Sequence, residues 1–341
     1  MIPDLNSKDF EQLEALLSTP KKIVITTHHK PDGDAMGSAM ALYNFLIQKQ
    51  HQVEVITSSD YPSFLHWLKN NEIVSIFHKN PSKSINSISA ADLIFCLDYN
   101  QLSRTEALAE HIGKSTADKV LIDHHLEPDS FCNINFSFVN SCATCEVLYH
   151  ILSKLDDKCI DQYIAECLYT GIITDTGSFR FDSTTSDTHI VAARLLEKGV
   201  STASVHERIY DDFSEERTRF LGYCIQNKLV VLPDFKTAFI SVTLEEQEKF
   251  NNKTGDTEGI VNYALSIAGV VMAVLFTEHK NMIKMSFRSK GVFSVRDLAS
   301  VHFNGGGHRN AAGGRSHDSL NETIDRFKSV LPEYKEEINK N

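Results

Sequence analysis

Long apolar runs are missing from the sequence, and none approaches the roughly 20 residues that a transmembrane helix needs. The first residues, MIPDLNSKDFEQLEALL, also lack the basic segment followed by an apolar segment that marks a signal peptide. We therefore exclude a membrane-spanning or secreted protein and expect a cytoplasmic one.

Cysteine is too scattered for a disulfide framework, because the 7 residues are odd in number and follow no regular spacing. One pair, Cys142 and Cys145, has the spacing of a metal or redox motif. No second pair lies nearby in the sequence, so we interpret these two residues as buried thiols near the start of a helix.

Positive charge is scarce as well, with 34 Lys and Arg residues against 45 Asp and Glu residues and a net charge of -11. Binding to long nucleic acid depends on arrays of basic side chains that release counterions. The composition therefore argues against long nucleic acid as a partner, but it is compatible with local sites for small anions. The 42% of hydrophobic residues is typical of a folded globular protein.

The length of 341 residues suggests two domains, at roughly 150 residues per domain. In the first half, helical patterns such as residues 35–49 alternate with apolar runs at residues 22–26, 53–56, 93–97 and 120–122. This alternation predicts an α/β domain with a mainly parallel sheet flanked by helices. Helical patterns, including residues 163–173, then dominate from residue 143 to about residue 228.

The last third of the sequence has a different pattern, with predicted strands at residues 230–232, 237–242, 270–276 and 283–287. Helices are predicted near residues 259–266, 295–301 and 320–330. This order indicates a smaller α+β domain. We place the first domain at residues 1–195, a linker rich in turn formers and charges at 196–219, and the second domain at 220–341.

Acidic and histidine side chains follow the apolar runs of the first domain. We place each of them at or just past the end of a predicted strand: His28, Asp32, Asp34, Asp98, Asp123, His124, His125 and Asp175. In an open α/β sheet the carboxyl ends of the strands form the ligand crevice. Side chains from distant segments of the chain can therefore converge there.

Such a convergence needs a counter-charge, because four buried carboxylates would repel one another. Two divalent cations would balance about four negative charges. Imidazole beside carboxylate suits manganese, iron, cobalt or zinc better than calcium or magnesium. Two such ions would lower the pKa of a shared water and stabilise charge during an attack on phosphorus. Taken singly, each aspartate also fits a helix cap or a turn, and we expect His29 to point away from the site.

Together, these segments resemble the motifs of the DHH phosphoesterase superfamily, which is named after the triplet Asp123-His124-His125. The segment 28–38 is similar to the first motif, His-x-x-Pro-Asp-x-Asp-Ala-x-Gly-Ser, at each fixed position. Asp98 matches the second motif, and the Thr-Asp-Thr-Gly run around Asp175 matches the fourth. The length and the C-terminal motif resemble the branch of nanoRNases and 3′-phosphoadenosine-5′-phosphate phosphatases, some relatives of which are described as exopolyphosphatase-related.

The resemblance implies a role for each matched residue. One metal ion would be held by His28, Asp32 and Asp98, and the other by Asp34, Asp98, His124 and Asp175. The catalytic residues would be Asp98, which bridges the two ions, and His125, which faces the scissile phosphate as a charge stabiliser or proton donor. Mn2+ is the favoured ion, with Mg2+ or Co2+ as alternatives. The sequence lacks the second acidic residue that many relatives carry after Asp98, and we interpret the nearby Arg104 as structural.

A glycine run near the C-terminus is the other distinctive segment. Consecutive glycines can expose backbone N–H groups to an anion, and flanking His and Arg side chains add charged donors. Spacing alone favours a glycine-rich turn before a helix, but the run is similar to that of the DHHA1 domain, where it binds substrate. The resemblance therefore implies a substrate-binding set of Arg288, Gly305, Gly306, Gly307, His308 and Arg309.

The activity implied by the resemblance is that of a two-metal phosphoesterase with its active site in the cleft between a DHH domain and a DHHA1 domain. It would hydrolyse short oligoribonucleotides (nanoRNA) to 5′-mononucleotides and convert 3′-phosphoadenosine 5′-phosphate to AMP. The expected partners are short RNA and small nucleotide phosphates, without long nucleic acid or a membrane, and a homodimer is left open. The alternatives are an exopolyphosphatase or pyrophosphatase, a phosphodiesterase for linear or cyclic dinucleotides, and a non-catalytic nucleotide-binding module.

Overall fold

The computed structural model describes residues 5, 8–253 and 255–340, so part of the N-terminal segment considered for a signal peptide lies outside the described residues. The chain divides into two compact units, Met1–Asp212 and Phe213–Asn341. This division falls within residues 196–219, where we placed a linker. Most of that segment is helical, because Ser201 caps α8 (Thr202–Tyr210) and Ser214 caps α9 (Glu215–Tyr223). Two of the serines in the segment, Ser201 and Ser214, are therefore helix caps.

The first unit contains a sheet of six parallel strands in the order β3-β2-β1-β4-β5-β6. Their bounds are β1 Lys22–Thr27, β2 Gln52–Thr57, β3 Ser75–Ile76, β4 Leu93–Leu97, β5 Asp118–Asp123 and β6 Ile134–Ser137. The predicted parallel α/β sheet is therefore confirmed. The strands β3 and β6 were not predicted, because β3 has only two residues and β6 alternates apolar and polar residues over four.

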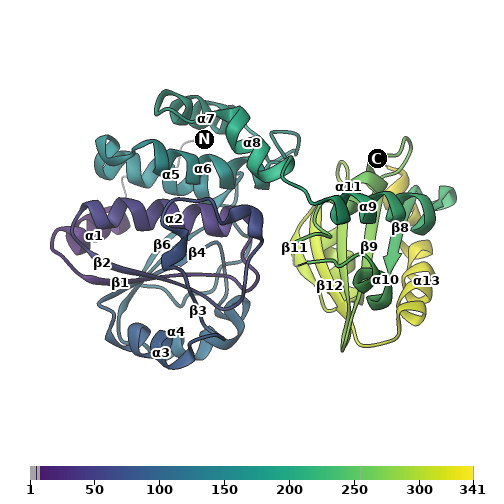
Figure 1. Cartoon of the computed structure of the whole chain (residues 1–341), viewed down its shortest axis with the longest axis horizontal. Coiled ribbons are helices and arrows are strands. Elements are labelled where there is room, and N and C mark those ends of the chain that lie inside the picture. The colour runs from purple at the N-terminus through teal and green to yellow at the C-terminus, as the bar shows by residue number, and fades with distance from the viewer. Residues whose placement is uncertain (1–4, 6–7, 254, 341) are drawn as a thin grey trace. The chain divides into compact units, whose positions relative to one another are not determined.

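Helices cover both faces of this sheet (Figure 1). On one face lie α1 (Lys8–Leu17), α2 (Gly33–Gln48), α5 (Thr144–Asp156) and α6 (Gln162–Asp175), with α7 (Ser186–Glu197) packed against α5 and α6. On the other face lie α3 (Pro81–Ala90) and α4 (Ala109–Lys114). Ile23 and Ile25 point into the core under α2, while Val24 points into the core under α3 and α4. Both faces of the sheet are therefore covered by apolar core, and the polar side chains lie at the ends of the strands.

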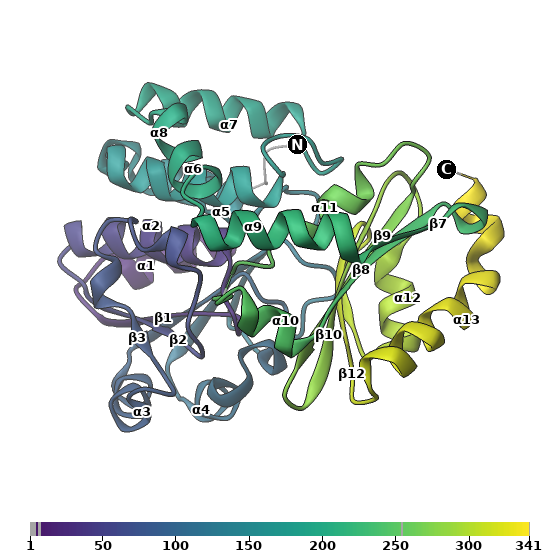
Figure 2. The same cartoon turned by 45° about the vertical axis from the view of Figure 1, so that its right-hand side comes forward.

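The second unit contains a mixed sheet of six strands in the order β11-β12-β10-β9-β8-β7. Their bounds are β7 Leu229–Leu232, β8 Thr237–Val242, β9 Met272–His279, β10 Met282–Ser289, β11 Gly306–His308 and β12 Ala311–Ser316. Helices α12 (Val295–His302) and α13 (Leu320–Asn339) cover one face, and α9 and α11 (Ile260–Leu265) cover the other (Figure 2). The predicted α+β domain is confirmed.

Gly306 and Gly307 of the glycine run lie in strand β11, which pairs with β12, so the alternative of a turn before a helix is wrong. A Cβ atom at Gly305 would lie 2.1 Å from the carbonyl oxygen of Gly313, and Gly307 has φ +135°. Glycine is therefore required at both positions by close backbone approach and by left-handed backbone. Strands rich in glycine carry little apolar signal, which is why β11 and β12 were not predicted.

In the part of the chain that the structure describes, every helix is too short or too polar to cross a membrane.

Candidate active site

The loop between β1 and α2 supplies two of the predicted site residues, His28 and Asp32. Asp32 is the N-cap of α2, and its Oδ1 accepts hydrogen bonds from the backbone N–H of Asp34 at 3.1 Å and of Ala35 at 3.2 Å. His28 directly follows β1, and its Nδ1 lies 2.9 Å from the carbonyl oxygen of His29. This contact leaves Nε2 of His28 facing Asp32 and Asp98, at 3.8 Å and 3.4 Å from their carboxylate oxygens.

Asp98 follows β4 and lies between two histidines. Its Oδ2 is 3.4 Å from Nε2 of His28, and its Oδ1 is 3.6 Å from Nε2 of His124. The residue is only 2% exposed, and its φ of +63° is a left-handed conformation that aspartate tolerates better than most residues. Strained backbone of this kind persists where the surrounding structure holds it, often at functional sites.

The triplet at the end of β5 separates into two roles. Nε2 of His124 lies 3.8 Å from Asp34 Oδ2 and 3.3 Å from Asp175 Oδ2. His125 instead turns its Nδ1 to Asp123, at 2.7 Å from Oδ1, and its backbone N–H donates to Oδ2 at 3.1 Å. Asp123 is fully buried, and its contact with Nδ1 fixes the orientation of the His125 ring. We did not predict a site role for Asp123, although its place before the two histidines was a usable signal.

Asp175 reaches this group from a helix. We placed it at the end of a strand, and this was wrong, because the run Thr170-Gly-Ile-Ile-Thr-Asp175 continues the predicted helix at 163–173 and ends α6. The backbone then turns sharply, with positive φ at Gly177, Ser178 and Phe179. The helix end thus presents Asp175 to His124.

The described side chains of the first unit form three groups that could hold a metal ion: His28 with Asp32 and Asp98; Asp34 with Asp98 and His124; and Asp98 with Asp123 and His125. Two ligands at about 2.1 Å from a shared cation lie about 3.0–3.5 Å apart. The nitrogen–oxygen separations of 3.3–3.8 Å between imidazoles and carboxylates are close to that spacing. The donor set therefore fits two neighbouring cations that share Asp98.

Buried charge also favours cations at this position. Burial, with the Asp98 carboxylate as the next contribution, raises the pKa of Asp34 to about 7, although His124 opposes the shift. Burial lowers the pKa of His28, but hydrogen bonds to Asp32 and Asp98 outweigh it and raise the pKa to about 10. His28 thus retains a proton near neutral pH and Asp34 is only partly ionised, and a bound cation would replace these protons.

Two neighbouring features lie outside this cluster. His29 contacts Ser58 Oγ at 3.2 Å and Glu106 at 3.6 Å, in line with the expectation that it points away.

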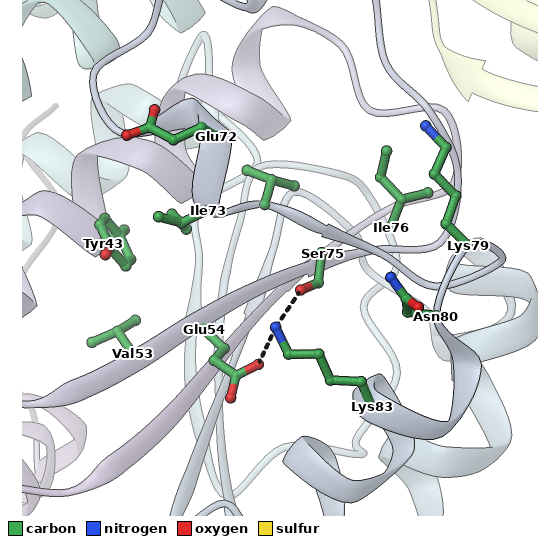
Figure 3. Close-up of a pocket in the computed structure, with 11 residues that line it drawn as sticks. Tyr43, Val53, Glu54, Glu72, Ile73, Ser75, Ile76, Lys79, Asn80 and Lys83 are labelled. Atoms are coloured by element: carbon green, nitrogen blue, oxygen red, sulfur yellow. Dashed lines mark hydrogen bonds and ion pairs between the residues drawn. The ribbon is translucent and has the colours of Figure 1, made fainter.

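A depression of about 710 Å³ lies where β3 separates from β2, and it shares no residue with the cluster. In it, Lys83 lies 4.0 Å from Glu54 and donates to Ser75 Oγ at 3.4 Å (Figure 3).

The predicted substrate-binding residues of the second unit lie on neighbouring strands. His308 of β11 pairs with Ala311 of β12, and Ala311 pairs with Arg288 of β10. Directly paired residues project from the same face of a sheet. Arg288 and His308 therefore stand on one face, on either side of the small Ala311, and both side chains are half-buried. This pattern can present two hydrogen-bond donors to one anionic ligand.

The glycines and Arg309 frame the same edge. Gly306 and Gly307 are exposed, and open space lies around the position of a Cβ at Gly306. Gly305 is held against α12, where its N–H donates to the carbonyl of Ala299 at 3.0 Å. Arg309 is exposed in the turn after β11. An exposed glycine backbone beside cationic side chains suits an anion, and the binding role of these residues stays a prediction.

In comparisons with known proteins, a separate family model matches each of the two units. The family described as DHH family, N-terminal domain, matches residues 22–172, and the DHHA1 domain matches residues 236–338. A bifunctional oligoribonuclease and PAP phosphatase NrnA of Mycoplasma genitalium is 30% identical over 302 residues, which cover 86% of this chain and 87% of the relative. The protein of the same name from Thermus thermophilus is 29% identical over 301 residues, covering 88% and 86%.

A solved structure shows the same similarity. The crystal structure of an exopolyphosphatase-related protein from Bacteroides fragilis is 36% identical, with a TM-score of 0.93 and coverage of 97% of both chains. These matches extend over both units. The chain therefore belongs to the DHH family of phosphoesterases and carries a C-terminal DHHA1 domain.

Proposed function

We propose that the protein hydrolyses short oligoribonucleotides to 5′-mononucleotides and dephosphorylates 3′-phosphoadenosine 5′-phosphate to AMP, with two divalent cations, preferably Mn2+. The observation that carries this proposal is the buried Asp98 between two groups of imidazole and carboxylate donors. The names of the relatives from Mycoplasma genitalium and Thermus thermophilus support the choice of substrates. We also propose a cytoplasmic location for this activity.

The residues of the first unit would have two kinds of role, metal binding and donation of a hydrogen bond or a proton. His28, Asp32 and Asp98 would hold one cation, and Asp34, Asp98, His124 and Asp175 the other. Bound divalent cations supply activation of water and stabilisation of charge on a phosphoryl group. His125 is not needed as a ligand in this scheme. Held by Asp123 at 2.7 Å, it would donate a hydrogen bond or a proton from Nε2 to the reacting phosphate or its leaving group.

The second unit would recognise the part of the substrate away from the scissile bond. Arg288 and His308 would bind a phosphate or nucleotide end, with Gly305, Gly306, Gly307 and Arg309 at the edge of that site. A second anchoring point favours substrates of a few nucleotides over long chains. The net charge of -11 supports this preference, because a long polyanion would be repelled by the rest of the surface.

A second candidate is the hydrolysis of polyphosphate or pyrophosphate. It is favoured by the description of the Bacteroides fragilis protein as exopolyphosphatase-related. Both candidates would use the same cluster around Asp98, so the cluster does not separate them. Arg288 and His308, on the sheet of the second unit, would favour nucleotides, because they would bind a second group of the substrate away from the scissile bond.

A substrate panel tests the proposed function. With Mn2+, we expect turnover of a dinucleotide, a pentanucleotide and 3′-phosphoadenosine 5′-phosphate at rates at least about 10-fold above a long single strand, a difference of about 1.4 kcal/mol in barrier. Chelation of the metal should remove all of these activities. Fast turnover of pyrophosphate or polyphosphate with slow turnover of the nucleotides would instead support the second candidate.

Substitution of Arg288 or His308 by Ala separates binding from chemistry. Loss of a hydrogen bond to a charged phosphate costs about 1.5–3 kcal/mol, so kcat/KM for the dinucleotide should fall about 10- to 100-fold, mainly through KM. A generic chromogenic phosphodiester should be hydrolysed almost as fast as by the wild type. Arg315→Ala is the matched control, because Arg315 is exposed on β12 and is paired with Lys284, away from Arg288. Equal losses on both substrates would contradict the binding role.

A further inference from the structure

The start of helix α5 contacts three of the predicted metal ligands. The backbone N–H groups of Thr144 and Cys145 donate to the two carboxylate oxygens of Asp34, at 2.6 Å and 2.9 Å. The hydroxyl of Thr144 donates to Oδ1 of Asp98 at 3.0 Å. His124 completes the set, since its Nδ1 lies 3.3 Å from the carbonyl oxygen of Ser141. A single segment of five residues thus touches ligands from three other elements.

Local helix chemistry explains why this segment is available. The first backbone N–H groups of a helix have no partner within the helix. Ala143 is the N-cap of α5 and makes no side-chain capping bond, so the carboxylate of Asp34 on α2 takes that part. The positive end of the helix dipole also favours a carboxylate there. Asp34 is therefore fixed in one orientation before any cation binds.

Buried side chains hold the segment itself in place. Oε2 of Glu146 accepts a hydrogen bond from the backbone N–H of Cys142 at 2.9 Å and another from the hydroxyl of Ser141. Glu146 is only 2% exposed. Cys142 and Cys145 are buried free thiols at the helix start, as we interpreted them from the sequence. The segment is therefore rigid, and the position of the Ser141 carbonyl against His124 follows from it.

Thr144 contacts two of the three carboxylates that would hold the second predicted cation, Asp34 and Asp98. Its side chain is completely buried, and its hydroxyl has one acceptor among the predicted ligands, Asp98. A hydrogen bond to Oδ1 fixes the rotation of the carboxylate, which leaves Oδ2 turned toward His28. Groups that orient metal ligands in this way commonly change metal affinity by about 10- to 100-fold when they are removed.

We propose that Thr144 is a positioning residue of the metal centre, which couples the two cation positions by holding Asp34 through its backbone and Asp98 through its hydroxyl. This inference rests on the proposed two-metal function. It assigns a role to a residue that lies outside the DHH triplet and outside the acidic and histidine motifs.

Titration of the full-length protein with Mn2+ tests the role. Thr144→Val removes the hydroxyl but retains the backbone N–H and the size of the side chain. We expect calorimetry to show Mn2+ affinity reduced about 10- to 100-fold, and electron paramagnetic resonance to show loss of the coupled signal of a Mn2+ pair at a concentration that saturates the wild type. Thr144→Ser retains the hydroxyl and should restore both readouts.

A matched control separates positioning from the general loss of a buried hydrogen bond. Thr105 is also buried in the first unit, and its hydroxyl donates only to the carbonyl of Leu102 among the contacts described for it, at 2.7 Å. Thr105→Val should lower the melting temperature of the metal-free protein about as much as Thr144→Val, with unchanged Mn2+ binding. If Thr144→Val bound Mn2+ like the wild type, or no worse than Thr105→Val, the inference would be overturned. A wild type that binds no pair of Mn2+ ions would instead overturn the proposed function.

Discussion

Replacing Asp98 with Asn is expected to lower kcat/KM for a dinucleotide by at least about 10³-fold, the effect of losing roughly 4 kcal/mol of charge stabilisation. Asp98 is the one predicted ligand that both proposed cations would share, so its neutralisation should weaken the binding of both. Asn tolerates the left-handed backbone of this position and can still accept the hydrogen bond of Thr144. The fold should therefore persist, which a circular dichroism melting curve can verify.

Asp118→Asn is the matched control for this substitution. Asp118 is exposed at the amino end of β5, the strand next to β4, and so lies at the opposite end of the sheet from Asp98. Its loss of charge should leave kcat/KM within about 2-fold of the wild type, because exposed charges away from a site contribute little. Near-normal turnover by a folded Asp98→Asn protein would end the claim that this carboxylate bridges two cations.

Replacing His125 with Ala should have the next largest effect, a fall in kcat of about 10²- to 10⁴-fold, as for the loss of a general acid. In contrast to Asp98→Asn, this variant should bind Mn2+ with nearly normal affinity, because His125 turns its Nδ1 to Asp123 and is not needed as a ligand. Steady-state kinetics together with Mn2+ titration measure the two quantities separately.

His29→Ala provides the comparison for His125. His29 follows the predicted ligand His28 but contacts Ser58 and Glu106, and its removal should leave kcat nearly unchanged. A loss of Mn2+ affinity in His125→Ala would show that this histidine is a ligand. An unchanged kcat would exclude it from the chemistry.

The convergence of the acidic and histidine residues was predictable because parallel strands all end at one edge of their sheet. His28, Asp98 and the triplet at Asp123 each follow a strand whose apolar run was recognised in the sequence. Asp175 also joined the group, but from a helix. Its segment continues the helical pattern predicted at residues 163–173, so the sequence itself favoured a helix end over the strand end that we predicted.

Other parts of the site depend on contacts that periodicity does not encode. Thr144 and Asp34 are 110 residues apart, and their contact follows from the packing of α5 beside α2. The strands β11 and β12 are held by backbone pairing in a glycine-rich segment, where side-chain pattern carries little information. The same pairing places Arg288 beside His308, and no spacing rule would have predicted it.

The pairing of Arg288, Ala311 and His308 also fixes the spacing between two of the predicted substrate-binding residues. With neighbouring strands about 4.8 Å apart, the Cα atoms of Arg288 and His308 are spaced by roughly 10 Å, and backbone pairing sets that distance. Ala311 lies midway between Arg288 and His308, on the strand that pairs with both. We propose that a larger side chain at residue 311, between Arg288 and His308, would change which ligand lengths are accepted while the residues around Asp98 stay untouched.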